Sequence, residues 1–186
     1  GSVVTWGYSA YGGDSSAVDL SSDVVKIYST DTAYAALKSD GSVVTWGQND
    51  WGGDSSSVNL TNVVDIVASY GAFAAIKSDG SVVTWGSSSH GGDSSAVQAS
   101  LAGGVSKGDI FANDYAFVLI KNDGEVVSWG HPSRGGDSSG VSFEVISEEI
   151  SFNESVTAIE YTEVFGVTSV VQADPASNSI NVATNK

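Results

Sequence analysis

The stretch SDGSVVTWGSSSHGGDSS at Ser78–Ser95 decides the fold, because it joins a turn, a strand and a second turn and because its parts recur along the chain. The segment GSVVTWG occurs at Gly1–Gly7, Gly41–Gly47 and Gly80–Gly86, and GEVVSWG occurs at Gly124–Gly130. Each copy is followed by the segment GGDSS, at Gly12–Ser16, Gly52–Ser56, Gly91–Ser95 and Gly135–Ser139. The tryptophans of the repeat are therefore 40, 39 and 44 residues apart. A period of about 40 residues is typical of a propeller blade or of a two-helix solenoid unit.

The pattern inside the repeat indicates strands and not helices. Short runs of β-branched and aromatic residues are bounded by Ser, Asp, Asn and Gly, and no helical period continues through them. In the first full repeat we expect strands at Val24–Ile27, Ala33–Lys38 and Ser42–Trp46. The Asp-Gly pair before the last of these favours the positive-φ turn of a tight hairpin, and a fourth short strand or a single helical turn is expected after GGDSS. The sequence thus predicts an all-β fold, a β-propeller of about four short blades with three to four antiparallel strands each.

The repeats set the expected domain boundaries. We expect a single repeat domain over residues 1–172, with repeats at about 1–40, 41–79, 80–123 and 124–172, and a polar tail or linker over residues 173–186. The fourth repeat is degenerate, since Ile150–Gly166 aligns with Ile110–Val127 but lacks the Asp-Gly turn and the tryptophan. Ser2–Trp6 is a third strand without the two strands that precede it elsewhere. Either Glu149–Glu160 supplies them and closes a four-bladed ring, which we favour, or the chain is an open fragment of a longer propeller whose edge accepts a neighbour.

The charge balance narrows the class of partner. The chain has 7 Lys and Arg against 22 Asp and Glu, a formal net charge of -15. We therefore expect no nucleic-acid partner, because phosphate binding depends on basic side chains. No apolar run approaches the roughly 18 residues that span a bilayer, so we expect no direct membrane insertion. The chain has no Cys, which excludes disulfides, and no Met, from which we expect a processed or excised piece of a longer protein. Its acidity suits an extracellular or cell-surface setting.

Two connected stretches resemble a known family. VVDIVASYGAFAAI at Val63–Ile76 precedes SDGSVVTWG at Ser78–Gly86, and a glycine-rich turn follows. This order resembles the regulator of chromosome condensation repeat family, and the likeness covers about residues 1–172. The resemblance implies a propeller, usually of seven blades in the full-length family, that displays loops to protein partners. The repeats here are shorter, and GGDSS stands where the family more often has Gly-Gln-Leu-Gly, so the chromatin and nucleotide-exchange roles of its best-known member are not carried over.

Four aspartates recur after the glycine pairs, at Asp14, Asp54, Asp93 and Asp137. Together with the neighbouring serine hydroxyls they are candidate ligands for Ca²⁺, which takes six to eight oxygen ligands. The alternative is that each aspartate closes an Asx turn on its own backbone while the glycines take positive φ. We favour the turn, because the calcium-binding nonapeptide repeat needs a GGxGxDx pattern that GGDSS does not match.

The aromatic residues fall into two groups. One position of every repeat is a tryptophan, so we expect these residues in the core between adjacent blades: Trp6, Trp46, Trp85 and Trp129. A position in the loop before GGDSS varies instead, and carries Tyr11, Trp51, His90 and Arg134. Variation among aromatic, histidine and arginine side chains on a common edge is typical of a binding surface, so these four are the candidate binding residues. Unselected loop drift is the alternative.

Catalysis has little support in the sequence. His90 and His131 both lie in variable loops, and neither has the recurrent Ser or Asp partner that a catalytic triad requires. We therefore expect a non-enzymatic protein-interaction or structural module, with a protein partner or self-assembly and no required cofactor. Two alternatives stay open, a calcium-dependent adhesive or assembly element and the substrate-binding arm of a larger regulatory enzyme.

Overall fold

The computed structural model describes residues 1–106, 109–141, 161–164, 167–174 and 179–184. The chain divides into two compact units, Gly1–Phe143 and Glu144–Lys186. In the second unit, β10 (Tyr161–Val164), β11 (Val167–Asp174) and β12 (Ser179–Thr184) form one antiparallel sheet in the order β10-β11-β12. The expected repeat domain over 1–172 and tail over 173–186 stay a prediction, and β12 lies within the expected tail.

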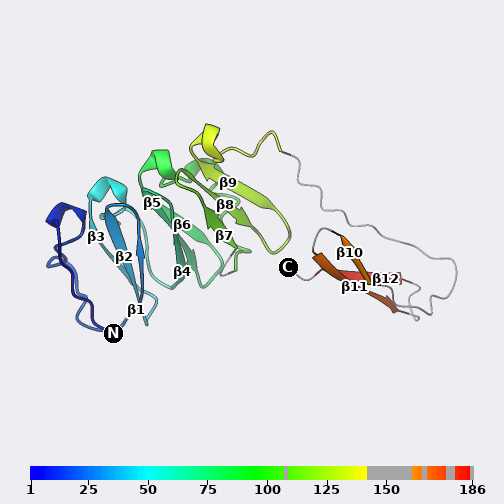
Figure 1. The fold of residues 1–186 in the computed structure, drawn as a ribbon, viewed down its shortest axis with the longest axis horizontal. Helices are drawn as coiled ribbons and strands as arrows, with labels where there is room; N and C mark the ends of the chain where they lie inside the picture. The colour runs from blue at the N-terminus through cyan, green and yellow to red at the C-terminus, as the bar shows by residue number, and fades with distance from the viewer. Residues whose placement is uncertain (107–108, 142–160, 165–166, 175–178, 185–186) are drawn as a thin grey trace. The chain divides into compact units, whose positions relative to one another are not determined.

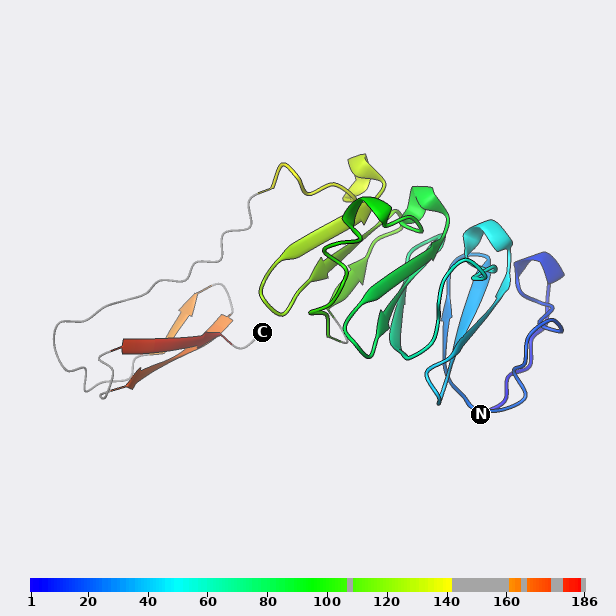
Figure 2. The same cartoon turned by 180° about the vertical axis from the view of Figure 1, so that it is seen from behind.

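The first unit is built from three antiparallel sheets of three strands each, arranged one after another (Figures 1 and 2). The first sheet holds β1 (Val24–Ser29), β2 (Ala33–Lys38) and β3 (Val43–Gly47). The second holds β4 (Val63–Ala68), β5 (Ala72–Lys77) and β6 (Val82–Gly86). The third holds β7 (Ile110–Ala112), β8 (Ala116–Ile120) and β9 (Val126–Gly130). The all-β class and the three strands of each full repeat are therefore confirmed.

Each Asp-Gly pair forms the expected hairpin, but by a different turn. Gly41 donates its N–H to the Lys38 carbonyl and Lys38 donates to the Ser42 carbonyl, at 3.0 and 2.9 Å. Gly41 has φ +80° while Asp40 does not have positive φ. This is a type I turn followed by a left-handed residue, which gives a three-residue loop with a bulge. The carboxylate of Asp40 accepts the Ser42 N–H at 2.9 Å and so stabilises the turn.

The second sheet is apolar on both faces, because it packs against a neighbouring sheet on either side. We call the face toward the following sheet the forward face and the opposite one the rear face. On the second sheet, Ala72, Ala74 and Ile76 lie on the forward face in a cluster with Phe117 and Trp129 of the third sheet. Successive strand residues point to opposite faces, so the residues between them lie on the rear face. There Phe73 and Ala75 pack with Ala33, Ala35 and Leu37 of the first sheet.

One tryptophan contact holds each junction between repeats. The indole Nε1 of Trp46, Trp85 and Trp129 donates to the carbonyl of Gly12, Gly52 and Gly91, respectively, at 3.0, 3.1 and 3.1 Å. These tryptophans are 5%, 3% and 3% exposed, so their predicted core position is confirmed. Trp6 is 84% exposed, and there the prediction was wrong. The described residues place no sheet and no glycine pair in front of Trp6.

The two glycines of each pair serve different purposes. Gly52 has φ +102°, and a Cβ atom there would lie 2.6 Å from the ring of Phe73, which stacks on Trp85 with ring centroids 5.0 Å apart. A Cβ atom on Gly53 would instead lie 2.5 Å from the carbonyl oxygen of Gly47. The first glycine, having no side chain, therefore leaves room for an aromatic ring, and the second leaves room for the backbone that crosses beside it.

The expected strand at Ser2–Trp6 does not form. Val3 donates its N–H to the Leu20 carbonyl at 2.9 Å, and Gly1 accepts the N–H of Val24 at 3.0 Å. The segment therefore lies beside the first sheet without joining a sheet of its own. The described residues form no closed ring, and the proposed closure through Glu149–Glu160 lies outside them. Within the described parts of the chain, no helix has the length and apolar character needed to cross a membrane.

A pair of glycine substitutions tests the ring-on-glycine contact. Gly52 and Gly135 have φ of +102° and +101°, so Gly→Ala imposes the same backbone strain at both, of about 1 kcal/mol. Only Gly52 has a ring where the new Cβ atom would lie. We expect Gly52→Ala to lower the free energy of unfolding by about 1–3 kcal/mol more than Gly135→Ala does, because the Phe73 ring must shift. Urea unfolding measures both, and equal losses would contradict the contact.

Candidate functional site

Short 3-10 turns place the four candidate binding residues at corresponding points of successive repeats. Tyr11 ends η1 (Ser9–Tyr11), Trp51 ends η2 (Asn49–Trp51), His90 ends η3 (Ser88–His90) and Arg134 ends η5 (Pro132–Arg134). A glycine with left-handed conformation follows each of them. The turns line one edge of the array (Figure 1), so the shared edge expected from the sequence is present. The helical turn expected after GGDSS occurs once among the described residues, as η4 (Ser95–Val97).

A recurring hydrogen bond fixes three of these positions. The loop between the first two strands of each sheet donates a side-chain hydrogen bond to the carbonyl of the residue that ends the 3-10 turn. Thr30 bonds Trp51 at 3.1 Å and Ser69 bonds His90 at 2.8 Å. In the third sheet Asn113 bonds Arg134 at 3.0 Å. A different residue type makes this hydrogen bond in each repeat, which keeps the edge in register while the side chains at the end of the 3-10 turn vary.

The side chains form a continuous row. The ring of Trp51 lies 5.2 Å from that of Tyr70 and 5.2 Å from that of His90, measured between centroids. His90 stacks on Tyr115 at 5.2 Å, and the guanidinium of Arg134 lies 4.0 Å from the Tyr115 centroid in a cation–π contact. We call Trp51, Tyr70, His90, Tyr115 and Arg134 the aromatic rim. Three of the four predicted binding residues are thus brought together.

Tyr11 is not placed in this row by any described contact. Its ring lies 5.1 Å from that of Tyr8, edge to face, and it is 52% exposed. The loop that anchors the equivalent residue in the later repeats belongs to the first two strands of a sheet, and no such strands precede Tyr11 among the described residues. The first repeat therefore carries the residue but not its anchor.

Tyr70 and Tyr115 were not predicted as binding residues. Each lies in the loop between the first two strands of its sheet, but the two occupy different positions of the repeat. Tyr70 corresponds to Asp114 and Tyr115 to Gly71, counted from the alanines that begin β5 and β8. Gly71 itself makes room for the row, since a Cβ atom there would lie 2.9 Å from the Trp51 ring and 3.2 Å from the His90 ring. A search for aromatic residues in every loop of the repeat would have found both tyrosines.

The charged groups that act on the aromatic rim differ between His90 and Tyr70. Burial lowers the pKa of His90, while the nearby Asp114 carboxylate opposes that shift. The Nδ1 atom of His90 lies 2.9 Å from the Ser87 hydroxyl and 3.0 Å from the Ser89 hydroxyl. At the other end, a hydrogen bond with the Asp31 carboxylate raises the pKa of Tyr70. The carboxylates of Asp31 and Asp114 are therefore the charges that act on Tyr70.

The aspartates after the glycine pairs close Asx turns, as predicted. The Oδ1 atoms of Asp14, Asp54, Asp93 and Asp137 accept the N–H of the serine two residues later at 2.9, 2.8, 2.9 and 2.9 Å. In each case this backbone hydrogen bond lowers the pKa of the carboxyl group. Among the described residues no three His, Asp or Glu side chains are grouped so that they could hold a metal ion.

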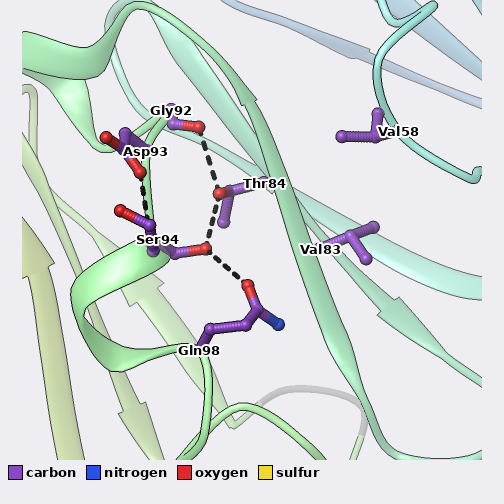
Figure 3. A pocket seen from close by; sticks show the side chains of 8 residues that line it. Val58, Val83, Thr84, Gly92, Asp93, Ser94 and Gln98 are labelled. Atoms are coloured by element: carbon purple, nitrogen blue, oxygen red, sulfur yellow. Dashed lines mark hydrogen bonds between the residues drawn. The ribbon is translucent and has the colours of Figure 1, made fainter.

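A hollow of about 280 Å³ lies beside β6, lined by Val58, Val83 and the turn at the third glycine pair (Figure 3). Its polar groups bond to one another. The Thr84 hydroxyl lies 3.1 Å from the Gly92 carbonyl and 2.9 Å from the Ser94 hydroxyl, which donates to Gln98 at 3.4 Å. These groups hold the turn, and the aromatic rim is the stronger candidate for binding.

Gly71→Ala tests the packing of the rim. Gly71 does not have positive φ, so the new methyl group adds no backbone strain and acts only by pushing Trp51 and His90 apart. We expect a loss of about 1–3 kcal/mol in the free energy of unfolding and a changed near-ultraviolet circular dichroism spectrum. Gly140 has nothing within 4 Å of its Cβ position, so Gly140→Ala serves as the control. An unchanged spectrum for Gly71→Ala would show that the rings do not meet at this residue.

The lowered pKa of His90 predicts a pH dependence of stability. At a pH between the pKa of His90 in the folded chain and its ordinary pKa, the unfolded chain binds more protons than the folded chain. The contribution of His90 to the free energy of unfolding is therefore complete above the ordinary pKa and is lost as the pH falls below it. We expect His90→Gln to flatten the part of the stability curve between about pH 8 and about pH 5. The comparison is urea unfolding of wild type, His90→Gln and His131→Gln across that range. A curve unchanged by His90→Gln would refute this assignment.

Comparison with protein-family models gives no match, and comparison with curated proteins gives none either.

Proposed function

We propose that this chain is a non-enzymatic protein-interaction module whose contact surface is the aromatic rim. The support is a separation of roles within the repeat. The residues that recur without change, the tryptophan and the glycine pair, build the junctions between sheets. The residues that vary lie at one exposed edge and are held there by a hydrogen bond that is kept in three repeats. Constant residues in the core and variable ones on an anchored edge suit a scaffold that displays a binding surface.

We also propose that the three sheets are blades of a propeller-type array related to the regulator of chromosome condensation repeats, in an extracellular or cell-surface protein. The period of about 40 residues and three antiparallel strands for each full repeat support this. So does the packing of consecutive sheets face to face through a junction that recurs within the chain.

The chemistry of the rim favours a partner with basic side chains. The faces of Trp and Tyr rings attract ammonium and guanidinium groups, and Arg134 already occupies the face of Tyr115 in this way. At the other end, Tyr70 lies beside the carboxylate of Asp31, which would pair with such a group. The net charge of -15 adds long-range attraction for a basic partner.

The serine and histidine contacts on the rim support binding better than catalysis. Ser87 and His90 belong to one 3-10 turn, and Ser87 and Ser89 both approach the same Nδ1 atom. A nucleophile and base need a third group that orients the base and donors that stabilise an oxyanion. The rings of Trp51, Tyr70 and Tyr115 surround His90 instead.

Selection from a displayed peptide library tests this function. We expect the immobilised full chain to enrich peptides with Lys or Arg. Trp51→Ala should weaken their binding at least about tenfold, because a central aromatic residue carries much of the energy of a contact surface. Trp6→Ala removes the same side chain away from the rim and should leave the affinity unchanged. Equal loss in both variants, or peptides without basic residues, would contradict the proposed site.

A further inference from the structure

A sequence motif that the aromatic rim does not use lies in the connection between β3 and β4. Asn59, Leu60 and Thr61 form the pattern Asn-x-Thr, and the related pattern at Asn153–Ser155 lies outside the described residues. Asn-x-Ser or Asn-x-Thr, with any residue but proline in the middle, is the acceptor pattern for N-linked glycans. So short a pattern also occurs by chance, and the position of its side chains must decide what it does.

The middle residue of the motif is buried and the two residues beside it are exposed. Leu60 is 8% exposed and belongs to the hydrophobic cluster between the first and second sheets. Asn59 and Thr61 are both exposed. Leu60 therefore anchors the segment to a core that the structure describes on both sides, while its neighbours lie at the surface. A glycan is bulky and hydrophilic, so it needs an acceptor in such a surface position.

The hydrogen bonds of Asn59 leave its amide nitrogen available. The Oδ1 atom of Asn59 accepts the backbone N–H of Thr61 at 3.1 Å and the Thr61 hydroxyl at 2.8 Å. A backbone N–H can only donate, so the atom that faces it must be the amide oxygen. Among the described residues, none accepts a hydrogen bond from the Nδ2 atom of Asn59. Asn113 differs, because its Nδ2 atom donates to the Arg134 carbonyl at 3.0 Å.

The corresponding turn of the first repeat shows that the fold does not require an amide at this position. Asp19 takes the place of Asn59, and its Oδ1 atom accepts the N–H and the hydroxyl of Ser21 at 3.0 and 2.6 Å. Leu20 between them is 5% exposed, as Leu60 is buried in the second repeat. A carboxylate therefore closes the same turn, which explains a side-chain oxygen at position 59 but not the amide nitrogen. Aspartate also closes the other Asx turns that end on a serine in the described chain, at Asp14, Asp40, Asp54, Asp79, Asp93 and Asp137.

We propose that Asn59 is an acceptor for an N-linked oligosaccharide and that the turn closed by Thr61 presents it. The inference rests on the extracellular or cell-surface setting proposed above, because secreted chains meet a membrane-bound oligosaccharide transferase. In the reaction, the Nδ2 atom forms a bond to the anomeric carbon of an oligosaccharide that is carried on a lipid diphosphate. The bond from that carbon to the diphosphate oxygen breaks, the lipid diphosphate leaves, and the amide nitrogen gives one proton to a base of the transferase.

The attached oligosaccharide lies away from the aromatic rim. The carbonyl of Gly41, in the hairpin turn before β3, accepts the N–H of Val63 at 2.8 Å, and the Cβ position of Gly41 lies 3.2 Å from the Cα atom of Asn62. The motif therefore ends beside the turn that begins β3, whereas η2 with Trp51 follows the end of β3. The hairpin turns and the 3-10 turns lie on opposite edges of the three sheets (Figures 1 and 2). An oligosaccharide on Asn59 thus leaves the rim open to a partner.

Secretion of the full chain from a eukaryotic host tests the proposal, with Asn153→Gln in every sample so that Asn59 heads the remaining acceptor pattern. We expect the intact mass to exceed that of the polypeptide by one oligosaccharide, and an amide-cleaving glycosidase to remove the excess. Asn59→Asp should abolish the excess and keep the turn, because Asp19 closes the matching turn with a carboxylate. Thr61→Ala should also abolish it, whereas Thr61→Ser should retain it, since the pattern requires a hydroxyl group.

The matching turn of the first repeat supplies a gain-of-site variant. Asp19→Asn combined with Ser21→Thr reproduces the motif around Leu20 and should add a second oligosaccharide. A chain secreted without an oligosaccharide overturns the proposal, and so does an oligosaccharide that persists in Asn59→Asp. Failure of the double variant to gain one overturns the role given to the turn. Mass reports the oligosaccharide without any partner, so these outcomes are independent of peptide binding at the aromatic rim.

Discussion

The hydrogen bond from a buried indole to the carbonyl of a left-handed glycine is the contact on which the first unit depends. It joins a strand end of one repeat to the turn of the repeat before it, and the aromatic ring that stacks on the indole also covers the glycine. A buried carbonyl left without a donor costs free energy comparable to a lost hydrogen bond, so tryptophan and glycine must be kept together. This explains why both halves of the motif are invariant across the repeats, although they lie in different sheets.

The exposed edge follows from the same arrangement. A glycine directly follows each 3-10 turn, so the junction also fixes the direction in which the side chain of the residue before the glycine points. That residue is Trp51, His90 or Arg134, and its carbonyl is bonded to the neighbouring loop. The backbone N–H groups of Asp31 and Tyr70 donate to the carbonyls of Tyr70 and Asp114, which ties the loops together along the edge. The rim is therefore a consequence of the core and needs no element of its own.

Much of the fold could be predicted from the sequence because its elements recur in successive repeats. The strands, the hairpins at Asp-Gly, the Asx turns at GGDSS and the buried Trp46, Trp85 and Trp129 all lie in segments that recur, where one inference is supported several times. The errors lie where a repeat is incomplete. Trp6 has the sequence of a core residue and the environment of a surface one, because burial depends on a neighbouring sheet that the local pattern does not contain. Tyr70 and Tyr115 escaped notice because they occupy different repeat positions, and only the stacking of successive loops brings them into one row.

The face-to-face stacking of the sheets has a further consequence for how such a chain can change. In the described part of the first unit, packing joins each sheet to the next, and every junction uses a tryptophan and a glycine pair. Duplication or loss of a whole repeat therefore leaves the remaining junctions intact and requires no compensating change in the core. Each duplication also lengthens the exposed edge by one variable side chain. The length of the edge and its chemical character can thus diverge between related chains far faster than the scaffold that carries them.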